Sequence, residues 1–175
     1  MKLHLGCGKK YFAGWTNLDI EGTTADIIDD AKTLTSIPNH SCDIIYAAHL
    51  LEHFGRKEVA GVLKVWFNKL KPKGVLRLSV PDFEKVVYMY HKGYKMPQLW
   101  GFLIGGQRDE FDYHKIVFDR ESLTDLLLET GFKTVKTWDW RKTEHSHYDD
   151  YSQAYLPHMD KEKGTLMSLN LEAYI

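Results

Sequence analysis

The chain of 175 residues has little cysteine, no excess charge of either sign and no long apolar run. Its two cysteines, Cys7 and Cys42, have no metal-type spacing, which argues against a disulfide scaffold and favours a reduced, cytoplasmic protein. The 23 basic and 24 acidic residues nearly cancel, so we expect no nucleic-acid partner. Without a membrane-length apolar stretch or a charged leader, we also expect no membrane span and no secretory signal.

The residues that are present predict one globular α/β domain, residues 1–175. Apolar and aromatic content of 43% and 13% is sufficient for a real core. Strand-like segments alternate with helical stripes, which predicts a mostly parallel sheet with helices on both faces. The predicted strands are 2–5, 16–19, 26–29, 42–47, 75–80, 132–140 and 166–174. The predicted helices are 56–70, one around 83–90, and one between an Asp119 cap and Gly131.

The first connection between strands is unusually short. Only ten residues separate Gly8 from Asp19, and Gly14 interrupts them, whereas parallel crossovers usually need a dozen or more. We therefore expect a loop or a single helical turn there, with Phe12 and Trp15 covering the sheet in place of a helix.

Two glycines follow the first strand, in the sequence Gly6-Cys7-Gly8. Glycine lets the backbone turn tightly and approach a ligand closely, because it has no Cβ. The full dinucleotide fingerprint needs a third glycine three positions further on, where this chain has Tyr11. The pair alone is therefore weak support for a nicotinamide or flavin site.

Acidic residues end the next two strands, which strengthens the prediction of a nucleoside site. Asp19 closes the second strand, and Asp29 and Asp30 follow the third. Ligands of open α/β sheets bind at the carboxyl ends of the strands, where these acids meet the glycine turn. We expect Asp19 to accept from ribose hydroxyls and Asp30 to accept from an exocyclic amine such as that of adenine.

An ordered set of motifs from residue 2 to about residue 140 resembles the class I S-adenosylmethionine-dependent methyltransferases. It is closest to the small group in which this domain stands almost alone. The matching motifs are Leu5-Gly6-Cys7-Gly8, Asp19, Asp30, Leu51-Glu52-His53, Leu70 to Gly74, His114, Asp119 and Gly131-Phe132. The resemblance implies a Rossmann-like, doubly wound sheet of seven strands, mostly parallel, with an antiparallel last strand.

The same resemblance implies S-adenosylmethionine as the cofactor. The residues that it assigns to cofactor binding are Gly6, Cys7, Gly8, Asp19, Asp30, Ala31 and His49. The chain departs from the family at Lys10, where a third glycine is common. Lys9 or Lys10 is a candidate for contacting the methionine carboxylate of the cofactor instead.

The expected reaction is methyl transfer to a small-molecule or glycan-like acceptor. Most of the acceleration in such a reaction comes from aligning acceptor, methyl group and sulfur in a dry pocket. Where the acceptor is a hydroxyl, His114 is the candidate general base by position and titration range. We expect residues 142–164, an insertion between the last two strands, to form the acceptor side of the pocket, with Tyr151 and His158 facing in.

Other functions remain open from the sequence. A non-catalytic nucleoside-binding module would need the same turn and acids, and an NAD-dependent oxidoreductase is a weaker alternative. His49 and His53 are four residues apart and could ligate a metal from one helix face, and residues 105–158 contain further histidines and aspartates. Neither spacing is diagnostic, so we expect no metal.

Overall fold

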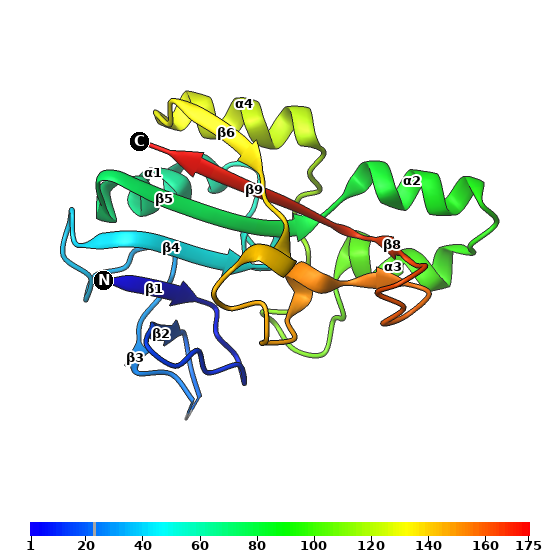
Figure 1. The fold of residues 1–175 in the computed structure, drawn as a ribbon, viewed down its shortest axis with the longest axis horizontal. Coiled ribbons are helices and arrows are strands. Elements are labelled where there is room, and N and C mark those ends of the chain that lie inside the picture. The colour runs from blue at the N-terminus through cyan, green and yellow to red at the C-terminus, as the bar shows by residue number, and fades with distance from the viewer. Residues whose placement is uncertain (23) are drawn as a thin grey trace.

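The computed structural model describes residues 1–22 and 24–175. Its main element is a seven-stranded sheet of order β3-β2-β1-β4-β5-β9-β6 (Figure 1). The strands are β1 (Lys2–Leu5), β2 (Thr16–Asp19), β3 (Ile27–Ile28), β4 (Cys42–Ala48), β5 (Leu70–Pro81), β6 (Thr134–Thr137) and β9 (Ser168–Tyr174). Strands β1 to β5 pair in parallel, and β9 lies antiparallel between β5 and β6. The predicted Rossmann-like fold is confirmed.

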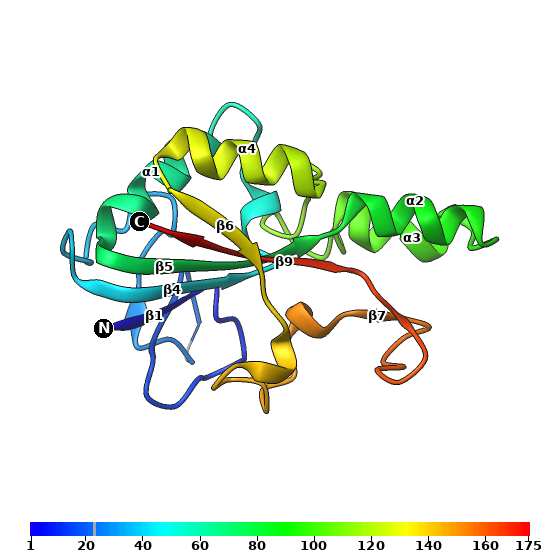
Figure 2. The same ribbon diagram turned by 45° about the horizontal axis from the view of Figure 1, so that its top comes forward.

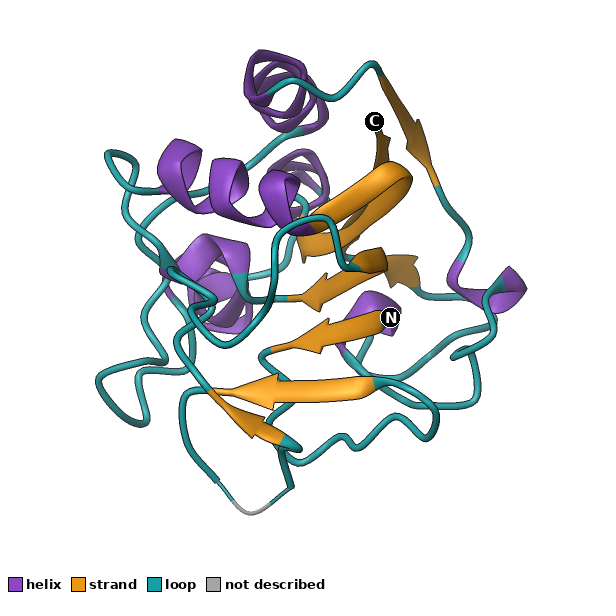
Figure 3. Ribbon diagram, turned by 90° about the vertical axis from the view of Figure 1, so that its left-hand side faces the viewer, coloured by secondary structure: helices purple, strands orange, loops and turns teal. Residues whose placement is uncertain are grey.

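Two of the helices pack on one face of this sheet, as Figure 3 shows. They are α1 (Val59–Lys69) and α4 (Arg120–Thr130), whose buried aliphatic side chains join those of the central strands in one core. The α4 helix has the predicted ends. The carboxylate of Asp119 accepts from the backbone N–H of Ser122, and Gly131 follows the helix with φ of 122°.

The opposite face has no α-helix over it in the part of the chain that the structure describes. Phe12 and Trp15 cover it with Tyr46, as predicted for the short first crossover, and Trp138 and Tyr148 pack against them. The expectation of helices on both faces is therefore corrected. Aromatic side chains from loops fill the space here, because the ten-residue crossover leaves no chain for a helix.

The connection from β6 to β9 supplies the outer part of that cover. It contains two 3₁₀ turns, η2 (Trp140–Lys142) and η3 (Tyr151–Gln153), and a two-stranded ribbon of β7 (Tyr155–Leu156) and β8 (Thr165–Leu166). The predicted final strands are thus shorter than expected. Residues 132–140 give only the four-residue β6, and 166–174 divide into β8 and β9.

Helices α2 (Phe83–His91) and α3 (Met96–Ile104) pack together and project beyond the end of β5 (Figure 2). Helix α2 was expected, whereas α3 was not. Leu99 of α3 is fully buried against α2, in a small cluster that is separate from the main core. Among the described residues, no helix is long and apolar enough to span a membrane.

Candidate functional site

A cavity of about 540 Å³ lies at the carboxyl ends of β1, β2 and β4. The volume is in the range of small-molecule sites, and the position is where open α/β sheets bind ligands. Five of the predicted cofactor residues line it: Gly6, Asp19, Asp30, Ala31 and His49.

The glycine turn has the left-handed backbone that its composition predicts. Gly6 and Gly8 have φ of 62° and 52°, a region that side chains other than glycine rarely adopt. A Cβ on Gly6 would lie 3.0 Å from a methyl group of Leu50. The carboxylate of Asp19 holds the turn, accepting from the backbone N–H of Gly8 at 2.7 Å and of Ile20 at 2.8 Å.

The paired acids after β3 have separate tasks. Asp29 organises the following turn, because its carboxylate accepts from the backbone N–H and the hydroxyl of Ser36. Asp30 borders the cavity, and its carboxylate accepts from the backbone N–H of Lys32 at 2.8 Å. The carbonyl of Ala31 accepts from the indole N–H of Trp66 at 2.6 Å, which fixes this wall to helix α1.

Four residues in or beside the turn are not among those that line the cavity: Cys7, Gly8, Lys9 and Lys10. The Cys7 side chain is buried, and burial, followed by the charge of Asp19, raises the pKa of its thiol to about 11. Cys7 is therefore no nucleophile at neutral pH. Lys9 and Lys10 are exposed and are not among the residues that line the cavity.

His49 begins the loop after β4 and is held on both sides. It has φ of 50°, and its backbone N–H donates to the carbonyl of Ser79 at 2.8 Å. Its ring Nε2 lies 3.0 Å from the hydroxyl of Ser168, and Tyr151 stacks on the ring at 5.2 Å. Burial lowers the pKa of His49 to about 3, so the imidazole is neutral at physiological pH.

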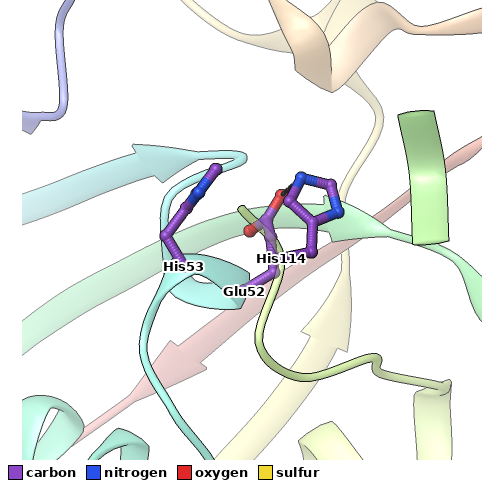
Figure 4. Close-up of side chains that lie close together, drawn as sticks. All are labelled: Glu52, His53 and His114. Carbon is purple, nitrogen blue, oxygen red and sulfur yellow. Dashed lines mark ion pairs between the residues drawn. The ribbon is translucent and has the colours of Figure 1, made fainter. Parts of the chain in front are cut away.

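A second group of ionisable side chains, here called the Glu52 cluster, consists of Glu52, His53 and His114 (Figure 4). Glu52 and His53 belong to the 3₁₀ turn η1 (Leu51–His53), and His114 comes from the loop after α3. One potential ligand atom from each lies within 4.8 Å of the other two. Burial raises the pKa of Glu52 to about 8 and lowers the pKa of both histidines.

The predicted general base, His114, does not line the cavity. Its Nδ1 lies 3.1 Å from the carbonyl of Phe102, and its Nε2 lies 3.8 Å from Oε1 of Glu52. His53, whose ring centroid lies 4.9 Å from that of His114, does border the cavity. Its role as general base stays a prediction.

Sequence reasoning did not identify Glu52 as a site residue. The available signal was the spacing of His49, Glu52 and His53 within one short segment. His114 is far along the chain, and only the folding of the loop after α3 brings it to that segment.

The insertion at residues 142–164 lies in its first part over the aromatic face and in its second part beside the cavity. In the first part, the ring of His145 is buried between Phe12 and Tyr46. Tyr151 borders the cavity, whereas His158 does not. The proposed acceptor role of the insertion therefore concerns Tyr151.

The strand order is that of a Rossmann-like fold, and the glycine turn and the acid at the end of β2 lie where such folds bind nucleosides. Residues 3–78 match the family model described as a methyltransferase domain. The matched region contains the glycine turn, Asp19 and Asp30.

Solved structures share the fold at low sequence identity. A SAM-dependent methyltransferase from Archaeoglobus fulgidus is 18% identical, with a TM-score of 0.63 over 99% of this chain and 85% of that one. A possible histamine N-methyltransferase from Thermotoga maritima is 16% identical, with a TM-score of 0.64 over 99% and 81%.

The 1,6-didemethyltoxoflavin-N1-methyltransferase of Burkholderia thailandensis, solved with 1,6-didemethyltoxoflavin and S-adenosylhomocysteine, is 14% identical. Its TM-score is 0.61 over 99% of this chain and 69% of that chain. A search of curated protein sequences found no match.

Proposed function

We propose that this chain is a class I S-adenosylmethionine-dependent methyltransferase that acts on a small-molecule or glycan-like acceptor, and that the cavity beside Gly6 and Asp19 holds S-adenosylmethionine. The observation that carries the proposal is the convergence of five predicted cofactor residues on one cavity. Cys7 and Gly8 would contribute only backbone, because the Cys7 side chain is buried and Gly8 has none.

Asp19 is suited to bind the ribose. Its two carboxylate oxygens each accept one backbone N–H, and each oxygen has a second lone pair to accept from a hydroxyl. Asp30 and Ala31 form the neighbouring wall, where the adenine would lie. The absence of a side chain at Gly6 allows the ligand to approach the backbone closely.

The acceptor would enter from the side of the loop after α3. Phe111, Asp112 and Lys115 line the cavity there, and Tyr151 lies on its rim with 60% of its surface exposed. Aromatic faces and charges together suit a polar molecule with hydroxyl groups.

The chemistry required of these residues is mainly positional. The acceptor atom forms a bond to the methyl carbon as the carbon–sulfur bond breaks, and the electron pair stays on sulfur to give S-adenosylhomocysteine. A hydroxyl acceptor also loses a proton. Alignment in a site that excludes water provides most of the rate enhancement.

Calorimetry with S-adenosylhomocysteine tests the cofactor site. Asp19→Ala should weaken binding by about 2–4 kcal/mol, because two ribose hydroxyls lose a charged acceptor. Asp19→Asn keeps one acceptor oxygen and should lose less. Asp125→Ala, an exposed aspartate of α4, serves as the control. Unchanged affinity in Asp19→Ala, or equally tight binding of NAD by the native chain, would contradict the assignment.

Two neighbouring aromatic residues test the acceptor side. Phe111 lines the cavity and is 49% exposed, whereas Tyr113 is 44% exposed and does not line it. In transfer of labelled methyl groups to a metabolite or glycan extract, Phe111→Ala should raise the KM for the acceptor with S-adenosylhomocysteine affinity unchanged. Tyr113→Ala should leave both unchanged. Equal effects of the two variants would place the acceptor elsewhere.

A further inference from the structure

We propose that the Glu52 cluster binds one divalent transition-metal ion, such as zinc, at the inner wall of the cavity. This differs from the expectation drawn from the sequence, in which no metal is bound. Four observations support the site. They are the burial of Glu52, the lack of hydrogen-bond partners for its carboxylate oxygens, the orientation of the histidine rings and the position of the cluster beside the cavity.

The Glu52 side chain is only 1% exposed. Neither of its carboxylate oxygens has a hydrogen-bond partner among the described residues. Burial of an unpaired carboxylate costs several kcal/mol or more, so native proteins normally pair such a group or use it to coordinate a metal. Its ion-pair contacts within residues 1–22 and 24–175 are imidazoles, from His49 at 3.4 Å and His114 at 3.8 Å.

The histidine rings are oriented as metal ligands usually are. A backbone carbonyl can only accept, so the contact of His114 Nδ1 with the Phe102 carbonyl places the proton on Nδ1. The lone pair on Nε2 then faces Glu52. Ligating histidines commonly donate their other N–H to a carbonyl in this way, which fixes the ring and its tautomer.

His53 completes the cluster. Its Nδ1 is buried and has no hydrogen-bond partner in the described chain. Its ring lies edge-on to that of His114, with the ring centroids 4.9 Å apart. Ligand bonds of about 2.0–2.2 Å require the three ligand atoms to come closer than their present separation, which side-chain rotation can achieve.

The donor set selects the class of ion. Two imidazole nitrogens and one carboxylate oxygen suit zinc, iron, nickel or manganese, whereas magnesium and calcium prefer oxygen ligands. His49 would lie beside this site, with its Nδ1 facing Glu52 and its Nε2 near the Ser168 hydroxyl.

The position of the site indicates what the ion would do. His49 and His53 both border the cavity, so a remaining coordination position would face the acceptor. An ion there would orient a hydroxyl acceptor and favour loss of its proton to water, before the oxygen attacks the methyl carbon and sulfur leaves with the electron pair. This part of the inference rests on the proposed function.

Metal binding is measured on the full chain after treatment with a chelator. Titration with ZnCl₂ by calorimetry, with metal analysis after gel filtration, should give one ion per chain. Glu52→Gln and His114→Gln should each weaken the affinity at least about tenfold. Glu129→Gln and His91→Gln change exposed residues of the same types and should bind as the native chain does.

Circular dichroism establishes that each variant is folded. Glutamine has the shape of glutamate and cannot ionise, so Glu52→Gln should fold. Absence of stoichiometric binding, or equal zinc affinity in Glu52→Gln and Glu129→Gln, would overturn the inference. S-adenosylhomocysteine binding by the same metal-free protein separates the two proposals, because it tests the cofactor cavity alone.

Discussion

The two faces of the sheet are covered by different kinds of structure. On one face, α1 and α4 bury aliphatic side chains against the strands. On the other, aromatic rings from loops stack in succession, with Phe12 only 4.4 Å from Tyr148 between ring centroids. Polar bonds hold the loops in place, including the one from the Tyr46 hydroxyl to Asp150 at 2.6 Å.

The two faces are therefore stabilised in different ways. Helices satisfy their own backbone groups, so their attachment depends mainly on apolar burial. The loops depend in addition on particular side-chain bonds, each of which a single substitution can remove. We therefore expect substitutions on the helical face to lower the free energy of unfolding of the whole domain. Substitutions on the aromatic face should first destabilise residues 138–153 locally.

The largest effect is expected on the helical face, from Trp66→Ala. Trp66 is fully buried, and its loss leaves a cavity and an unpaired Ala31 carbonyl. The free energy of unfolding should fall by about 3–5 kcal/mol in denaturant titration. Trp100→Ala is the control, since Trp100 is 50% exposed in α3. A loss of less than about 1 kcal/mol in Trp66→Ala would contradict the expected difference between the two faces.

On the aromatic face, the next largest effect should come from low pH acting on His145. Burial, followed by the Arg77 guanidinium, lowers the pKa of His145 to about 4. Glu144 raises it, while His4 and His147 add to the lowering. Because the unfolded chain binds this proton more readily, the free energy of unfolding should decrease as the pH falls from about 6.5 to about 4.

The loss attributable to His145 should be on the order of 2–3 kcal/mol. Protonation would also cost the bond from Arg77, whose guanidinium lies 3.0 Å from the His145 Nε2. Unfolding curves between pH 4 and pH 7.5 should have a smaller slope in His145→Gln than in the native chain. An equal slope in His145→Gln and in the exposed-site variant His91→Gln would show that His145 does not carry the effect.

A smaller and more local effect is expected from Tyr46→Phe. This change removes the hydroxyl that donates to Asp150 and should cost about 1–2 kcal/mol. Hydrogen exchange should accelerate in residues 146–153 and stay constant in α1. Tyr90→Phe, at a 53% exposed position, is the matched control. Uniform acceleration over the whole chain would mean that the two faces unfold together.

The smallest effect should come from the helix cap, in Asp119→Ala. Loss of the bond from the Ser122 N–H to the Asp119 carboxylate should lower stability by about 1 kcal/mol in denaturant titration. Asp125→Ala, within the same helix, should cost less. The reverse order would show that the cap does not stabilise this face.

Elements that depend on neighbouring residues could be predicted from the sequence, whereas those that depend on contacts between distant segments could not. The strands ending in Asp19 and Ala48 and the helix capped by Asp119 follow from local periodicity and capping residues. Helix α3 was missed because Pro97 and Gly101 interrupt an apolar run that has no clear helical period.

Within the site, local motifs identified the residues near the turn but not the Glu52 cluster. Gly6, Asp19 and His49 line the cavity because they lie at the carboxyl ends of strands or directly after them. The meeting of Glu52 with His114 depends on the path of the loop after α3, which no spacing encodes. The packing of His145 on the aromatic face likewise arises only from tertiary contacts.

The position of β9 in the sheet determines the order in which the strands can pair during synthesis. Strand β9 inserts between β5 and β6, both of which precede it along the chain. Until residues 168–174 have been made, β5 and β6 present open edges that another chain could pair with. The nascent protein can assemble β1 to β5 early, but the sheet is complete only when β9, which follows the other strands of the sheet along the chain, has been translated.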